Sequence, residues 1–202
     1  MAIACSCALD HPPRLVVLTG GPGAGKTAVL EVARRELCRH VVVLPEAASI
    51  LWRGLFPRHA TLPGRKAAQR AIVRLQLEMQ RMAIEEGPAA LVVCDRGTLD
   101  GLAYWPGTER AYFDDVETTK PRELSRYAAV IHLRPPPLEH GYVTNQFRIE
   151  TAAEAAAIDA RIDAAWAGHP RRFVVDSDDD FIAKLHRGLE LIRAEVPACC
   201  RR

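Results

Sequence analysis

The feature that most constrains this chain is the string GGPGAGKT at residues 20–27. It fills the pattern G-x-x-x-x-G-K-[ST], it follows an apolar run at 15–19, and it opens a helical pattern. Glycines let the backbone turn through conformations closed to other residues and bring its N–H groups close to an anion. A helix that begins near Lys26 adds the positive end of its dipole. The sequence therefore predicts a cradle for the phosphates of a nucleotide.

The positions of this cradle have distinct predicted tasks. Lys26 is expected to reach the β- and γ-phosphates, and the Thr27 hydroxyl is expected to ligate Mg²⁺. ATP is favoured as the phosphoryl donor, because the string at 119–122 lacks the aspartate of the N/T-K-x-D element that reads guanine; GTP is not excluded. The predicted nucleotide-binding residues are Gly21, Gly23, Ala24, Gly25, Lys26, Thr27 and Ala28.

Short apolar runs alternate with helical patterns along the chain, as in parallel strands joined by crossovers. None of these runs alternates polar and apolar residues, so helices are expected to cover both faces of the sheet. The sequence predicts an α/β fold with a five-stranded parallel sheet. The expected strands lie at 15–19, 41–44, 91–95, 128–133 and 172–176, and the expected helices at 26–38, 65–86, 98–105, 151–167 and 178–195, the last one capped by Asp178.

Length and composition limit the class of protein. The 202 residues contain no linker, charge run or repeat, so we expect a single domain over 1–202 with loose termini at 1–12 and 197–202. A net charge of +2 argues against a nucleic-acid partner. No apolar stretch is long enough to span a bilayer and the start lacks a secretory signal, which predicts a cytoplasmic protein without a membrane partner.

Six cysteines raise the question of a metal site. The pairs Cys5-x-Cys7 and Cys199-Cys200 lack the CxxC spacing of common zinc sites, and both lie in the expected loose termini. We therefore expect reduced thiols there, in keeping with a cytosolic location.

Acidic residues follow the second and third expected strands. Because ligands of such sheets lie beyond the carboxyl ends of the strands, these acids are candidates for chemistry. Asp95 is expected to lie on the metal side, and Glu46 to face the acceptor of a phosphoryl group; either of them could serve as the base. Arg96 could bind the acceptor or the transferred phosphoryl through its planar fork. The alternative is a surface turn pair at 95–96 and a helix-capping acid at Glu46.

The phosphate cradle, the string PEAA at 45–48 and the string CDRGTLDGLAY at 94–104 together resemble the P-loop small-molecule kinases. This group includes nucleoside, thymidylate and ribosylnicotinamide kinases, and the chain resembles its AAA-like ATPase and kinase branch. The resemblance implies a P-loop NTPase fold with a lid segment, a base role for Glu46, an acid–arginine pair at Asp95 and Arg96, and a contact between Asp100 and the acceptor. Gly97 departs from the family, which often has Ser or Tyr there, so the acceptor need not be a nucleoside.

The lid is expected over residues 134–155. Three prolines and a glycine predict an extended loop, and a Thr151–Glu154 capping box predicts the helix that follows. Asn145 and Arg148, followed by the alanine-rich helix, resemble the lid pattern of the family. By this resemblance, Arg148 is the predicted lid cation that closes over the phosphates. Such closure would exclude water from the transfer.

Three functions are compatible with these residues. The first is a Mg²⁺–ATP-dependent kinase that phosphorylates a hydroxyl of a small metabolite, for example a nucleoside-like compound. The second is a regulatory nucleotide-binding ATPase or GTPase that switches a protein or lipid partner. The third, a polynucleotide-end kinase, is disfavoured by the near-neutral charge. The expected ligands are a nucleoside triphosphate, Mg²⁺ and a small acceptor; a homodimer stays open.

Overall fold

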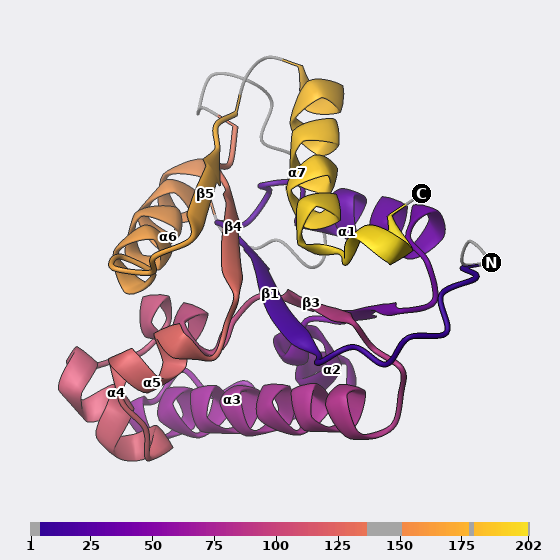
Figure 1. Cartoon of the computed structure of the whole chain (residues 1–202). Helices are drawn as coiled ribbons and strands as arrows, with labels where there is room; N and C mark the ends of the chain where they lie inside the picture. Colours follow the sequence, from indigo (N-terminus) through magenta and orange to yellow (C-terminus); the bar gives the residue numbers. More distant parts are fainter. Residues whose placement is uncertain (1–4, 137–150, 178–179, 202) are drawn as a thin grey trace.

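A parallel sheet forms the centre of the molecule (Figure 1). The computed structural model describes residues 5–136, 151–177 and 180–201. The strands are β1 (Arg14–Thr19), β2 (Val41–Leu44), β3 (Leu91–Asp95), β4 (Ala129–Leu133) and β5 (Arg172–Val175). Their order is β2-β3-β1-β4-β5, and every neighbouring pair is parallel. The predicted five-stranded parallel sheet is confirmed.

The position of β1 determines where a ligand of this fold would bind. β1 lies at the middle of the sheet, between β3 and β4. The turn after β1 therefore emerges at the carboxyl edge, beside the residues that follow β3 and β4. This is the edge at which parallel α/β sheets bind their ligands.

Helices follow the strands along the chain. They are α1 (Lys26–Glu36), α2 (Ala47–Arg53), α3 (Leu62–Glu85), α4 (Glu109–Val116), α5 (Lys120–Ser125), α6 (Ala152–Ala165) and α7 (Phe181–Glu195), with 3₁₀ helices η1 (Thr98–Ala103) and η2 (Ala198–Cys200). No helix in the described part of the chain is both long enough and apolar enough to cross a membrane.

Two apolar cores lie on the two faces of the sheet. On one face, Leu18 of β1 packs in a cluster with residues of α1 and α7 (Figure 1). On the other face, Val17 packs in a cluster with residues of α3, η1 and α6. Because successive strand residues point to opposite faces, a strand covered on both sides needs apolar residues at every position. This explains why none of the strand sequences alternates polar and apolar residues.

Several predicted boundaries differ from the structure. α3 begins at Leu62 rather than at residue 65, because the Thr61 hydroxyl accepts a hydrogen bond from Gly64 N and a proline lies in the first turn. The segment predicted as a helix at 98–105 is the 3₁₀ helix η1. α7 begins at Phe181 with Asp180 as its cap, whereas the predicted cap, Asp178, lies outside the described residues. The helices α2, α4 and α5 were not predicted.

Candidate active site

The turn between β1 and α1 has the backbone shape of a phosphate cradle. Gly20, Gly23 and Gly25 have φ angles of 133°, 80° and 91°, a region that side chains rarely allow. A Cβ on Gly20 would lie 2.0 Å from the carbonyl oxygen of Leu133, the last residue of β4. Glycine at this position therefore allows the turn to pass directly over the end of the neighbouring strand.

The N–H groups of this turn are partly engaged. Ala24 N donates to Gly21 O at 3.3 Å, and Ala28 N donates to Gly25 O at 3.1 Å. Gly21 N donates to a carboxylate oxygen of Asp159 at 2.7 Å. The backbone N–H groups of Gly23, Gly25, Lys26 and Thr27 have no hydrogen-bond acceptor among the residues that the structure describes. These four groups lie around the start of α1, where the helix dipole also favours an anion.

Lys26 lies across the turn. Its Nζ donates to Gly20 O at 2.9 Å and to Gly21 O at 3.0 Å, and the residue is buried. Burial and the neighbouring Arg96 charge lower the pKa of Lys26 to about 8, although the acids around it oppose this change. The lysine is therefore mainly protonated at neutral pH. It is ready to compensate phosphate charge in a site that also holds acids.

Glu46 and Arg96 form an ion pair at the carboxyl edge. Arg96 Nε donates to Glu46 Oε1 at 2.6 Å, and the Ser49 hydroxyl donates to Glu46 Oε2 at 2.5 Å. Burial alone would raise the pKa of Glu46, but the Arg96 charge and the Ser49 hydrogen bond outweigh burial and lower the pKa to about 2. Glu46 is also the N-cap residue of α2, but its side chain makes no capping hydrogen bond. Its carboxylate is ionised and held in place by side chains.

Arg96 connects three parts of the edge. Its backbone φ is 71°, an uncommon value for a residue other than glycine, and its N–H donates to Leu18 O at 3.0 Å. Its NH1 lies 3.3 Å from Gly20 O and 3.4 Å from Asp100 Oδ1. Gln76 of α3 donates from Nε2 to Arg96 O at 2.5 Å. Strained backbone of this kind persists only where the surroundings hold it, and it is enriched at functional sites.

Asp95 differs from Glu46 in its surroundings. Its Oδ1 is buried and has no hydrogen-bond partner among the described residues. Burial raises the pKa of Asp95 to about 6, against the lowering effect of Lys26. A buried oxygen without a partner, close to the charge of Lys26, suits a cation ligand, and the exposed Thr27 hydroxyl at the first turn of α1 is a second oxygen donor. These two residue types fit the oxygen ligands that Mg²⁺ prefers.

Asp100 is buried beneath this edge. Its Oδ1 accepts hydrogen bonds from the Thr19 hydroxyl and from Arg96. Its Oδ2 accepts from Gly97 N at 2.8 Å and from Trp166 Nε1 at 3.1 Å. The predicted contact between Asp100 and an acceptor stays a prediction. The observed hydrogen bonds support a positioning role for Asp100 in which it orients Arg96.

The Trp166 ring leaves no space for a side chain at Gly97. A Cβ on Gly97 would lie 2.3 Å from Cζ2 of the Trp166 ring and 2.8 Å from a methyl group of Val17. The indole, which is fully buried, fills the space that a Ser or Tyr side chain would need here. The departure from the family pattern at Gly97 therefore has a packing reason.

Two further residues at the edge were not recognised as part of the site in the sequence. Asp159 of α6 accepts hydrogen bonds from Gly21 N, from His132 Nε2 at 2.8 Å and from Arg134 NH1 at 2.9 Å. Gln76 of α3 is buried, and its side chain contacts the backbone of Arg96. Neither has a sequence signal, because their contacts join residues far apart in the chain.

Arg148, the predicted lid cation, lies outside the described residues, as does Asn145. Three basic residues of α3 are ion-paired with acids of α4 or of the residue that ends it. Lys66 and Arg70 contact Asp115 at 2.9 and 3.1 Å, and Arg74 contacts Glu117 at 2.7 Å. These three cations therefore have protein partners.

Comparisons with known proteins agree with this geometry. A family model described as an AAA domain matches residues 15–183. The solved structure of NadR in complex with NR is similar, with a TM-score of 0.67 and 14% identity over 93% of this chain, which spans 52% of the NadR chain. Thymidylate kinase from Candida albicans is similar with a TM-score of 0.55 and 13% identity, over 91% of this chain and 92% of that one. A search of curated proteins finds no match. The resemblance to P-loop small-molecule kinases and the P-loop NTPase fold are confirmed.

Proposed function

Because the chain belongs to the AAA domain family and has the fold of P-loop kinases, we propose that it transfers the γ-phosphoryl group of Mg²⁺–ATP to a hydroxyl of a small metabolite. A nucleoside-like compound is the first acceptor class to test, since the neighbours include a thymidylate kinase. The observation that carries the proposal is the ion pair of Arg96 with Glu46. It joins the acid after β2 to the phosphate cradle, because the same guanidinium lies 3.3 Å from Gly20 O.

The donor side of the proposed site is the cradle. The N–H groups of Gly23, Gly25, Lys26 and Thr27 would hold the phosphates. The Lys26 ammonium would stabilise the negative charge that develops on the oxygens of the leaving group. When bound, Mg²⁺ would neutralise phosphate charge, with Thr27 and Asp95 as the residues that hold it. Arg148 is kept as the proposed lid cation.

The acceptor side consists of Glu46 and Arg96. The ionised Glu46 carboxylate would accept the hydrogen bond of the acceptor hydroxyl and orient its oxygen towards the phosphorus. A loose transition state of phosphoryl transfer needs orientation more than a strong base, so the low pKa of Glu46 is compatible with this role. Asp95, with its raised pKa, is the competing candidate for the base.

A regulatory ATPase or GTPase is the second candidate. The same cradle would bind and hydrolyse a nucleotide, and a protein or lipid partner would respond to occupancy. The fold does not separate switches from kinases, because the phosphate cradle is common to both. The two candidates differ in where the phosphoryl group goes.

An acceptor screen tests the proposal. Purified protein, Mg²⁺ and ATP are incubated with nucleosides, nucleotides and other ribosyl compounds, and ADP release is measured with and without each compound. A kinase gives acceptor-dependent ADP release together with a phosphorylated product. Hydrolysis that no acceptor accelerates, or that only a protein or lipid partner accelerates, would refute the kinase proposal in favour of the regulator.

A further inference from the structure

Five of the six cysteines and two histidines gather at the opposite edge of the sheet from the phosphate cradle. They come from three places in the chain: the segment before β1, the turn between α1 and β2, and the 3₁₀ helix η2 near the end of the chain. The sequence pairs Cys5-x-Cys7 and Cys199-Cys200 are separated by about the whole chain, so their spacing gave no reason to expect a shared site.

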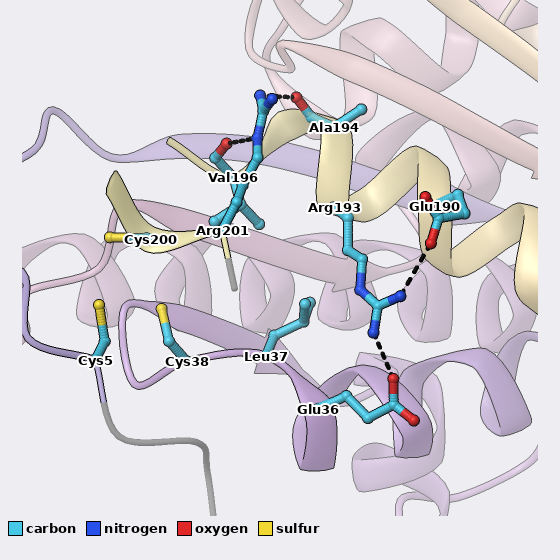
Figure 2. A pocket seen from close by; sticks show the side chains of 10 residues that line it. All are labelled: Cys5, Glu36, Leu37, Cys38, Glu190, Arg193, Ala194, Val196, Cys200 and Arg201. Atoms are coloured by element: carbon cyan, nitrogen blue, oxygen red, sulfur yellow. Dashed lines mark hydrogen bonds and ion pairs between the residues drawn. The ribbon is translucent and has the colours of Figure 1, made fainter. Parts of the chain in front are cut away.

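The first set of ligands has Cys200 at its centre. The Cys200 sulfur lies 3.4 Å from Nδ1 of His40, and the Cys38 sulfur lies 3.9 Å from the same nitrogen. With Cys5, these groups offer four ligand atoms that all lie within 4.8 Å of one another. Figure 2 shows the sulfur atoms of Cys5, Cys38 and Cys200 at one end of a pocket of about 650 Å³, away from the ion pairs of Arg193.

The second set shares Cys200 with the first. Nε2 of His11 lies 3.3 Å from the sulfur of Cys7, 3.5 Å from that of Cys199 and 3.7 Å from that of Cys200. The sulfur atoms of Cys199 and Cys200 are 4.0 Å apart. These four atoms also lie within 4.8 Å of one another.

The individual separations given above, from 3.3 to 4.0 Å, are close to those between the ligands of tetrahedral zinc. With Zn–S of about 2.3 Å and Zn–N of about 2.0 Å, two ligand atoms of one tetrahedron lie about 3.5–3.8 Å apart. Each set contains three sulfurs and one nitrogen, a common composition for structural zinc. Two tetrahedra that share one corner need seven ligands, and two sets of four that share Cys200 supply seven.

We propose that this cluster binds two zinc ions, one in each set, with the Cys200 thiolate bridging them. The thiols give up their protons to solvent as they bind, and each imidazole uses the nitrogen that faces the sulfurs. Burial supports the assignment, since Cys7, Cys38, Cys200 and His40 are each at most 9% exposed. A soft, thiolate-rich set of this kind selects zinc over Mg²⁺.

The location indicates a structural role for the proposed zinc cluster. His11 lies shortly before the start of β1 and His40 directly before β2, so the cluster is at the amino ends of the strands, whereas the phosphate cradle follows the carboxyl end of β1. The length of β1, roughly 20 Å, separates the two sites. The cluster ties the first described segment and η2 to the sheet.

Metal content tests the proposal. The full chain is purified with reductant and without chelator, supplied with zinc, desalted, and analysed by elemental mass spectrometry. We expect two zinc ions per chain, and a lower melting temperature after removal of zinc. Cobalt added to the metal-free chain should give thiolate charge-transfer bands and the d–d bands of tetrahedral sites, a readout that needs no variant.

Variants distinguish the two sets. Cys5→Ser and Cys199→Ser should each lower the content from two zinc ions to one, and Cys200→Ser should lower it below one. Cys94→Ala, which removes the buried cysteine of β3 outside the cluster, is the matched control and should keep two. Three results would overturn the proposal: one zinc ion or none per wild-type chain, cobalt bands typical of octahedral sites, or a number of titratable thiols low enough to show that cysteines of the cluster form a disulfide.

Discussion

Arg96 donates a hydrogen bond of 2.6 Å from Nε to Oε1 of Glu46. These residues follow β3 and β2, so the pair joins the ends of two adjacent strands. The same guanidinium contacts Gly20 O in the phosphate cradle. The acceptor side and the donor side of the proposed site are therefore coupled through a single side chain.

Lys26→Ala should abolish triphosphate turnover, by roughly 100-fold or more, because the ammonium charge that balances the phosphates is lost. Turnover is measured as ADP release at saturating Mg²⁺. Arg74→Ala, which removes an exposed cation paired with Glu117, is the control and should keep wild-type turnover. Equal turnover in Lys26→Ala and the wild type would remove the cradle from the mechanism.

Glu46→Gln should spare ATP binding and lower transfer to the acceptor by roughly 100-fold, the usual effect of losing a group that accepts the hydroxyl proton. ATP binding is measured by calorimetry and transfer by product formation. Glu117→Gln, on the exposed end of α4, provides the control. An unaltered transfer rate in Glu46→Gln would return the base role to Asp95.

Asp95→Asn should stabilise the fold at pH 7. Burial raises the folded pKa of Asp95 from 3.8 to about 6, so the folded chain holds this proton more tightly than the unfolded chain does. The contribution of Asp95 to stability therefore falls as the pH rises from about 4 to about 6, and it stays low above that range. Removing the charge should raise the free energy of unfolding at pH 7 by an amount on the order of 2–3 kcal/mol, and by little at pH 4.

Urea denaturation of the wild type and Asp95→Asn at both pH values, without Mg²⁺, measures this difference. Asp114→Asn, at an exposed position of α4, should change stability little at either pH. If Asp95→Asn is less stable than the wild type at pH 7, the ionised Asp95 carboxylate does not destabilise the folded state, and the prediction is wrong.

Gly97→Ala should destabilise the fold by about 1–3 kcal/mol, because its Cβ would overlap the Trp166 ring, which is packed in the core. Gly87→Ala, at a position with no heavy atom within 4 Å, is the matched control. In a Trp166→Phe background, where the ring is smaller, the same Gly97→Ala change should cost less in urea denaturation than it does in the wild type. No loss in Gly97→Ala would mean that the indole does not need this space.

The strands and the long helices of the fold could be predicted from sequence, and the short helices could not. Apolar runs covered on both faces located all five strands to within one residue at each end. The helices α2, α4 and α5 have only six to eight residues each, too few for a helical period to stand out. For α5, Thr119 as the N-cap and Pro121 in the first turn are local start signals in the sequence.

Local signals predicted the cradle, but long-range packing determines the rest of the site. The pattern at 20–27 directly follows a strand and opens a helix, and its glycines allow the turn between them, so the backbone shape follows from neighbouring residues. The contact of Asp159 with Gly21 joins residues 138 positions apart, and that of Trp166 with Asp100 joins residues 66 apart. Motifs defined by short sequence spacing do not predict contacts between residues this far apart. The Cys and His cluster was missed for the same reason.

The fate of the transferred group tests the proposed function most directly. ATP labelled at the γ-phosphoryl is mixed with wild-type protein, Mg²⁺ and the best acceptor from the screen, and the label is followed over a single turnover. A kinase that orients a hydroxyl with Glu46 and Arg96 should transfer the label to the acceptor. With Lys26→Ala, the label should remain in ATP. Label found only in inorganic phosphate, at the same rate with and without acceptor, would contradict the proposal.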